Sequence, residues 1–231
     1  MIEHKFAIIG LGQFGGAIAR TLAQRGAEVL AIDQDERHVD EIADSVANAI
    51  ALDATDKKAL LSVDITSFDA VVVAIGEDFE QLLLTTTLLM ELGVKRIIAR
   101  ARGRNQKIIL QKIGVEEILS PEDEVGAAVA EKLVNPSIIS YLELPDAYSI
   151  MEIICPPAIS GCKLSDIDLR RRYHINLITI KKVSTVNESG FIKKVGRIAG
   201  IPHGETVVEG DDFLVLFGKR TDLERFIKVN Q

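Results

Sequence analysis

Short apolar runs alternate with amphipathic segments through the first 134 residues of this chain. Each run is typical of a strand, and the run over 68–76 is typical of one buried on both faces. The segments between the runs carry apolar residues at helical spacing, as Ile18 and Leu22 do. We therefore expect a doubly wound parallel sheet whose strands are joined by right-handed helical crossovers. The pattern predicts strands over 5–10, 28–33, 49–53, 68–76, 95–101 and 115–120. It predicts helices over 17–26, 35–46, 56–63, 78–93, 105–114 and 121–134.

The regular alternation ends near a segment that contains Pro136 and Pro145. Beyond it, apolar runs such as NLITIKKV and DDFLVLFGK predict strands with short helices and turns between them. A region of this composition and size is typical of a second, smaller α+β domain. The sequence thus predicts an α/β domain over 1–135, a linker over 136–148 and a second domain over 149–231.

Composition and charge narrow the class of protein. With 47% hydrophobic residues in 231, the chain has enough apolar content for a packed core. Its longest apolar stretch, 82–90, is far shorter than the ~20 residues that a membrane span requires. The chain starts without a recognisable secretory signal, so we expect a cytoplasmic protein. A net charge of -7 disfavours binding to nucleic acid, and Cys155 and Cys162 form neither a disulfide framework nor a zinc motif.

A glycine-rich turn lies between the first predicted strand and the first predicted helix. Gly10, Gly12 and Gly15 form the pattern GxGxxG. These glycines permit a tight turn, close approach of a pyrophosphate to the backbone, and close packing of helix on strand. Asp33 ends the second predicted strand, where a carboxylate can accept hydrogen bonds from a ribose hydroxyl and would repel a 2′-phosphate. Together these features predict a dinucleotide-type binding crevice.

Two further loops are expected at the same edge of the sheet. The segments Asp53–Asp56 and Ala74–Asp78 follow predicted strands, and open α/β sheets hold ligands at the carboxyl ends of their strands. For the first loop two interpretations remain open. Its side chains either contact an adenine or ribose, or Thr55 or Asp56 caps the following helix.

An enzymatic function finds little support in the residues. A dehydrogenase needs an acid or base tuned near neutral pH beside the nicotinamide. None of the four histidines ends a predicted strand of the first domain, and no Ser/Tyr/Lys cluster or nucleophilic cysteine in a basic setting is recognisable. We therefore expect no catalysis. An NAD-dependent oxidoreductase or a redox-sensing Rossmann protein remains the alternative.

Several segments in a fixed order resemble one known family. They are GLGQFGGAIARTL, EVLAID, DATD, VVVAIGED, IARAR, IGVEEILSPEDEVG and EGDDFLVLFG. This chain resembles the RCK (KTN) regulatory proteins of potassium uptake, of the TrkA/KtrA type, over essentially its whole length. The resemblance implies an RCK N-lobe followed by a TrkA-C domain. It also implies a cytoplasmic subunit that assembles into an octameric gating ring, peripheral to the membrane through a separate potassium channel or transporter of the Trk/Ktr type.

The resemblance further implies that the crevice holds an adenine nucleotide, which is NAD(H), ADP or ATP. Nucleotides with different phosphates would stabilise different arrangements of paired subunits. The residues implied to line the site are Gly10, Gly12, Gln13, Phe14, Gly15, Asp33, Gln34, Asp53, Ala54, Thr55, Ala74, Ile75, Gly76, Glu77 and Arg100. Members that distinguish ATP from ADP carry arginine at the position of Gln13, so the neutral amide makes NAD(H) or ADP more competitive here and leaves Arg100 to supply the cation.

Three weaker expectations complete the set. Glu122 matches a family position where carboxylates hold a divalent cation, although an acid there also stabilises a helix start. Ile167, Arg170 and Asn176 lie where some relatives bind cyclic di-AMP, although a run of arginines also forms an ordinary solvated surface. The helix over 78–93 is unusually apolar, and we expect part of it, including Leu89, to contact another subunit.

Overall fold

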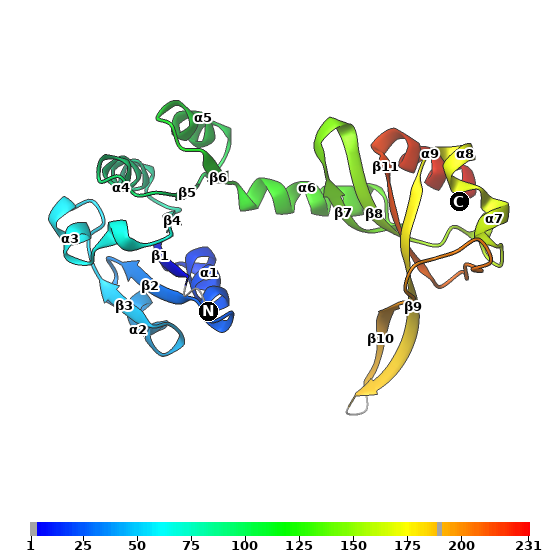
Figure 1. Cartoon of the computed structure of the whole chain (residues 1–231), viewed down its shortest axis with the longest axis horizontal. Helices are drawn as coiled ribbons and strands as arrows, with labels where there is room; N and C mark the ends of the chain where they lie inside the picture. The colour runs from blue at the N-terminus through cyan, green and yellow to red at the C-terminus, as the bar shows by residue number, and fades with distance from the viewer. Residues whose placement is uncertain (1–3, 189–190) are drawn as a thin grey trace. The chain divides into compact units, whose positions relative to one another are not determined.

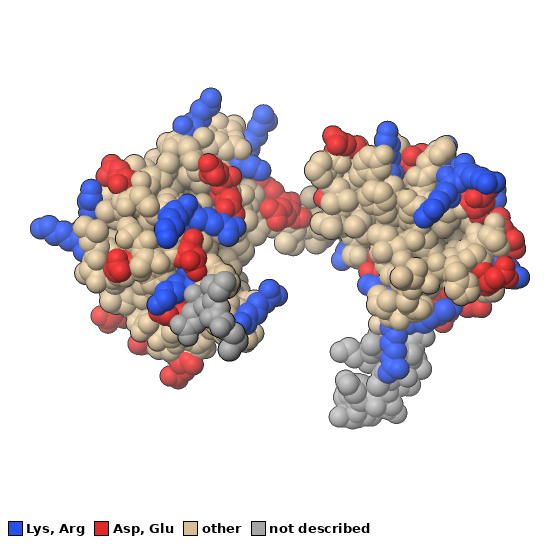
Figure 2. Space-filling view, in the orientation of Figure 1, with Lys and Arg blue, Asp and Glu red and all other residues tan. Residues whose placement is uncertain are grey.

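The computed structural model describes residues 4–188 and 191–231, with side chains described outside 183–195. The chain forms two compact units, Met1–Glu124 and Val125–Gln231, which are described separately below. Within the described residues, no helix is long and apolar enough to cross a membrane. On the face shown in Figure 2, basic and acidic side chains are interspersed over both units.

The first unit is built on a parallel sheet with the strand order β3-β2-β1-β4-β5-β6. Because β1 lies between β2 and β4, the chain leaves it toward one side of the sheet first and toward the other later (Figure 1). This order defines a topological switch point at β1 and β4, so the predicted doubly wound sheet is confirmed. The strands are β1 Lys5–Ile9, β2 Glu28–Asp33, β3 Asn48–Ala51, β4 Ala70–Val73, β5 Ile97–Arg100 and β6 Glu117–Leu119.

Helices cover both faces of this sheet. They are α1 Gln13–Gln24, α2 Glu36–Asp40, α3 Lys57–Ser62, α4 Phe79–Glu91 and α5 Arg104–Lys112, with short 3-10 turns η1 Ala43–Ser45 and η2 Ile65–Ser67. The predicted helix over 35–46 is wrong in length, because α2 ends at Asp40 and the chain continues through the η1 turn. Short 3-10 turns of this kind commonly follow α-helices.

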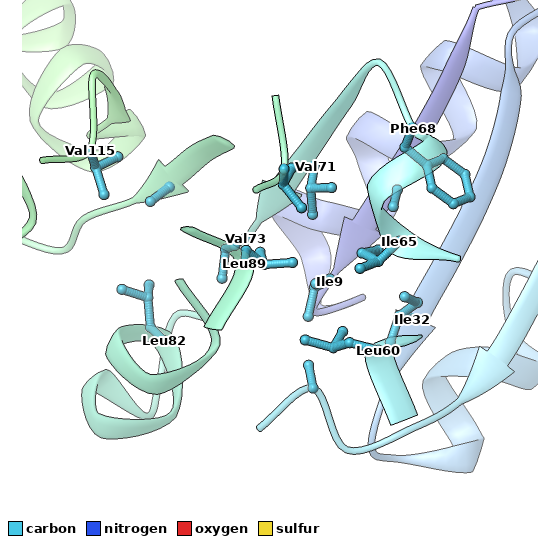
Figure 3. Packing of buried hydrophobic residues seen from close by; sticks show 14 of the residues in the cluster. Ile9, Ile32, Leu60, Ile65, Phe68, Val71, Val73, Leu82, Leu89 and Val115 are labelled. Carbon is cyan, nitrogen blue, oxygen red and sulfur yellow. The ribbon is translucent and has the colours of Figure 1, made fainter. Parts of the chain in front are cut away.

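Alternate residues of the inner strands β1, β2, β4 and β5 belong to two separate hydrophobic clusters. Ile9 and Val73 lie in one cluster with Leu60, Leu82 and Leu89 from α3 and α4 (Figure 3). The neighbouring strand residues Ile8 and Val72 lie in the other cluster, with Ala19 of α1 and Val39 of α2. A parallel sheet buried on both faces requires such continuous apolar strands, which is why the central β4 has no polar side chain.

Helix α6, Pro121–Val134, starts in the first unit and continues into the second. Pro121 occupies its first position, where a missing N–H removes no hydrogen bond. Glu122, Asp123 and Glu124 follow in the first turn, where carboxylates stabilise the positive end of the helix dipole.

The second unit contains an antiparallel sheet with the order β10-β9-β11-β8-β7. The strands are β7 Ile138–Glu143, β8 Tyr148–Ile154, β9 Asn176–Glu188, β10 Phe191–Ile198 and β11 Phe213–Lys219. The helices are α7 Leu164–Ile167, α8 Leu169–Tyr173 and α9 Arg220–Asn230, with 3-10 turns η3 Pro145–Ala147 and η4 Pro157–Ile159. Phe226 of α9 and Tyr173 of α8 meet edge to face within its hydrophobic core, their ring centroids 5.0 Å apart.

The segment 136–148, predicted as a linker, differs from expectation. Residues Ile138–Glu143 form β7, which pairs with β8 through a connection that contains the η3 turn. Pro145 lies in that turn. It therefore belongs to the connection between the two strands of a hairpin and does not mark an unstructured linker. The division between the two compact units also falls earlier than residue 135, between Glu124 and Val125.

Candidate functional site

The turn that follows β1 lies at the switch point of the sheet. The Gly10 N–H donates to the Ile32 carbonyl oxygen at 2.8 Å, and the Ala74 N–H donates to the Ile9 carbonyl oxygen at 2.7 Å. Gly10 has a φ of 92°, and a Cβ atom there would lie 2.9 Å from the backbone nitrogen of Ile75. A side chain at this position would therefore force apart the loops after β1 and β4.

Helix α1 begins directly after this turn and packs tightly against it. A Cβ atom on Gly15 would lie 1.8 Å from the carbonyl oxygen of Gly10, so the helix approaches the turn only because Gly15 has no side chain. Gly12 occupies the N-cap position, and its surroundings are open. Within the described part of the chain, no side chain caps this helix start, and its first turn has no acidic residue. The first N–H groups are thus free to bind an anion such as a phosphate.

The carboxylate of Asp33 ties the turn to the end of β2. It accepts hydrogen bonds from the Leu11 N–H at 2.6 Å and from the Asp35 N–H at 2.9 Å, and His38 Nδ1 lies 3.2 Å from its Oδ2. The side chain is 11% exposed. Asp33 is therefore held in one position at the crevice, with part of its acceptor capacity left for a ligand hydroxyl. The sequence did not indicate the contact between Asp33 and His38. It arises because the short α2 places His38 beside the end of β2.

A hydrogen bond joins the loop after β2 to the first turn of α4. Gln81 Nε2 donates to Gln34 Oε1 at 2.8 Å. Asp78 caps α4 by accepting the Gln81 N–H at 3.0 Å, while Glu77 is exposed beside it. The structure thus places Gln34 next to the loop that follows β4.

The loop after β3 is closed by its own side chains. Asp53 Oδ1 accepts the Thr55 hydroxyl at 2.7 Å and the Thr55 N–H at 2.9 Å. The Thr55 hydroxyl is the main reason that the pKa of Asp53 is lowered from its usual value. Asp56 caps α3 through the Lys58 N–H at 2.8 Å, so helix capping belongs to Asp56 and not to Thr55. Ala54 is buried between them.

Arg100 brings four segments of the first unit together at the end of β5. Its guanidinium lies 5.1 Å from the ring centroid of Phe14, which is in the first turn of α1. A Cβ atom on Gly76 would lie 2.8 Å from Arg100 Nη1. Arg100 Nη2 also hydrogen-bonds Glu122 Oε1 in the first turn of α6. The side chain is 17% exposed.

Arg102 is a second cation at this position, and sequence reasoning missed it. Its Nη1 donates to the Gly76 carbonyl oxygen at 3.1 Å, and its Nε lies 4.0 Å from Glu122 Oε1. The Arg100 hydrogen bond is the main reason that the pKa of Glu122 lies below its usual value. Arg102 follows Arg100 by two positions, in the loop after β5, and this repeat of arginine is the signal that would have found the pair.

The structure places the residues of the two weaker predicted sites, one for a divalent cation and one for cyclic di-AMP, as follows. Within the described residues, no group of three or more His, Cys, Asp or Glu side chains is placed to hold a metal ion, and Glu122 faces arginines. In the second unit, Arg170 Nε donates to Asn176 Oδ1 at 2.5 Å, so these two residues do lie together. Ile167 is buried in the hydrophobic core.

Leu89 was expected to contact another subunit, and the structure places it in the core instead. It is 0% exposed and belongs to the cluster that α4 forms against the sheet (Figure 3). The exposed apolar side chains of α4 are Leu84 at 49% and Met90 at 37%. The apolar run on this helix thus divides into a core face and an exposed face.

The strand order, the glycine turn and the acid after β2 together define the Rossmann-like doubly wound class. Residues 6–121 match the model of the TrkA-N domain family. The chain is 36% identical to Ktr system potassium uptake protein C of Bacillus subtilis (strain 168), over 98% of this chain and 97% of that protein. It is 34% identical to Ktr system potassium uptake protein A of the same organism, over 97% and 96%. The chain therefore belongs to the TrkA-N domain family, among relatives of the Ktr type.

A solved structure supports the fold independently. The GsuK channel bound to NAD matches with a TM-score of 0.51 and 21% sequence identity. The match covers 100% of this chain and 39% of that chain, so this protein spans less than half the length of the channel polypeptide.

Proposed function

We propose that this protein is a nucleotide-sensing regulatory subunit of a potassium uptake system, located in the cytoplasm beside the membrane. The observation that carries the proposal is the crevice at the switch point. It combines an uncapped helix start at Gly12, the fixed carboxylate of Asp33 and the cation of Arg100 around one open loop. This set matches two parts of an adenine dinucleotide or diphosphate, because amides and a cation bind phosphate and the carboxylate binds ribose.

The comparisons support a role in potassium uptake. The full-length relatives are named as potassium uptake proteins, and a fold neighbour was solved with NAD bound. We infer that the ligand is NAD(H), ADP or ATP and that the partner is the separate membrane subunit of a Trk/Ktr-type system. The role is regulatory, and hydride transfer to a substrate is not part of it.

Regulation requires that the ligand binds two states of the assembly with different affinities. We propose an octameric ring in which the exposed apolar side chains of two helices contact neighbouring subunits. These side chains are Leu84 and Met90 of α4 and Ile108 and Ile109 of α5, each at least 37% exposed. Exposed apolar side chains on adjacent secondary elements are typical of interaction surfaces.

A divalent cation at Glu122 and cyclic di-AMP near Arg170 and Asn176 rest on the family resemblance alone. For Glu122, the arginine contacts described above favour an ion pair in this state. For the second unit, the Arg170–Asn176 hydrogen bond supports only the proximity of the two residues.

The test of the proposed function is transport. The membrane subunit of a Ktr system is reconstituted in vesicles, and rubidium uptake is measured with and without this protein. We expect uptake to depend on the protein and to differ between ADP and ATP, or between NAD and NADH. Uptake that is the same with and without the protein, or with every nucleotide, contradicts the proposal. Nicotinamide turnover with small hydroxy acids would instead support the oxidoreductase alternative.

A further inference from the structure

The Arg100 guanidinium contacts both the first turn of α1 and the first turn of α6. It lies over Phe14, in the first turn of α1, and occupies the space that a Cβ atom on Gly76 would need. The same guanidinium binds the carboxylate of Glu122. Phosphate and carboxylate recognise a guanidinium in the same way, through planar charge-assisted hydrogen bonds. A ligand phosphate at α1 and Glu122 would therefore use the same donors.

The local charge leaves room for a second anion. Among the ion pairs of the described residues, Arg100 and Arg102 both lie within 4.0 Å of the Glu122 carboxylate, so two cations share that anion. Arg100 Nε is buried and has no hydrogen-bond partner in the described part of the chain. An unpaired buried N–H of a charged group is costly, and an arriving anion would remove that cost.

Glu122 has other partners if it loses Arg100. Arg102 Nε lies 4.0 Å from its Oε1, and Glu122 lies in the first turn of α6, where the helix dipole stabilises a carboxylate. The side chain is 46% exposed, so water can also solvate it. If Arg100 binds a ligand phosphate in place of Glu122, the Glu122 carboxylate is therefore not left buried and unpaired.

We propose that Glu122 is a specificity-determining residue that competes with the terminal phosphate of a bound nucleotide for Arg100. Ligands without a terminal phosphate leave the Arg100–Glu122 pair intact. Ligands with one draw Arg100 toward α1 and release Glu122 to Arg102. The pair therefore sets how steeply affinity depends on the number of phosphates, and it reports the ligand to the first turn of α6. This inference rests on the proposed nucleotide site.

The test uses the full-length protein in EDTA, so that no divalent cation contributes. Affinities for adenosine, AMP, ADP and ATP are measured by titration calorimetry for the wild type and for Glu122→Gln. We expect Glu122→Gln to bind ADP and ATP about 5- to 10-fold more tightly, the size of one charge-assisted contact at a partly exposed site. Its affinity for adenosine should change less than about 2-fold.

Glu117→Gln is the matched control. It removes a similar exposed ion pair, in which Arg96 Nε lies 2.6 Å from Glu117 Oε1. Glu117 begins β6 and Arg96 directly precedes β5, whereas Arg100 ends β5. We expect wild-type affinities for this variant. In a second comparison, Glu122→Gln is made in the Arg100→Gln background. There it should no longer raise the affinity for ADP and ATP, because the increase depends on Arg100.

Three results would overturn the inference. Glu122→Gln could bind ADP no more tightly than the wild type, or improve adenosine equally, or keep its gain when Arg100 is replaced. Each of these contradicts the competition while the nucleotide site itself stands. If the wild-type protein binds none of the four ligands, both the proposed site and this inference are wrong.

Discussion

The backbone N–H of Leu11 donates to the carboxylate of Asp33 at 2.6 Å, across 22 residues of sequence. This contact joins the glycine turn after β1 to the end of β2, so that the loop expected to hold phosphates and the acid expected to hold ribose form one rigid unit. A carboxylate that accepts backbone N–H groups is fixed in orientation before any ligand arrives, which lowers the entropic cost of binding.

Replacement of Asp33 should therefore affect both folding and binding. In Asp33→Asn, an amide NH2 would face the donor N–H groups of Leu11 or Asp35. We expect the melting temperature to fall by about 2–10 °C, from a loss of about 1–3 kcal/mol, and nucleotide affinity to fall with it. Asp69→Asn is the control, since Asp69 accepts the Lys5 N–H at 2.9 Å at the other end of β1. Equal nucleotide affinity in Asp33→Asn and the wild type would contradict the assigned role.

The free helix start at Gly12 can be blocked without strain. The position has a φ of −57° and open space around its Cβ direction, so a side chain fits. In Gly12→Asp, the carboxylate caps α1 and repels phosphate. We expect nucleotide affinity to fall about 10-fold or more, the effect of about 1.4 kcal/mol of repulsion, while the melting temperature is unchanged or higher. The neutral cap in Gly12→Asn separates charge from size. Should Gly12→Asp bind ADP as the wild type does, the phosphates do not lie at α1.

The two faces of α4 should respond differently to substitution. Leu84→Asp changes a side chain that is 49% exposed, and we expect a folded protein whose assembly is reduced in mass by light scattering. Leu89→Ala instead opens a cavity in the core and should lower the free energy of unfolding by about 2–5 kcal/mol in urea. An assembly of unchanged mass in Leu84→Asp would exclude α4 from the subunit contact.

The Asp53–Thr55 turn predicts a pH dependence. The hydrogen bond from Thr55 lowers the folded-state pKa of Asp53 below 3.8, so the ionised form is favoured in the folded protein. The resulting stabilisation is present above the unfolded-state pKa and is lost as the pH falls through the folded-state pKa. We expect Thr55→Val to melt below the wild type at pH 6, with the difference shrinking toward pH 3. A difference that grows on acidification would contradict this assignment.

Much of the first unit follows from local patterns in the sequence. Apolar runs located all six parallel strands. The signal is clearest for β4, because a strand buried on both faces leaves a continuous apolar run. The turn at Gly10 and the acid at Asp33 were also predictable, because one strand–helix–strand unit sets the spacing between them.

Other features depend on contacts that spacing does not encode. Leu89 and Leu84 are both leucines on one helix, and only the position of the sheet decides which is buried. The strand β7 was missed because prolines flank it. It pairs with β8, the next strand along the chain, in a hairpin. The pairing of Arg100 with Glu122 joins residues on β5 and α6, which nothing in the sequence marks as neighbours.

The most direct test of the nucleotide-sensing crevice is titration calorimetry of the wild-type protein with NAD, NADH, ADP and ATP. The crevice described above predicts saturable binding of at least one of them with a dissociation constant below ~1 mM, which corresponds to about -4.1 kcal/mol. No heat of binding from any of the four at millimolar concentrations would contradict the account.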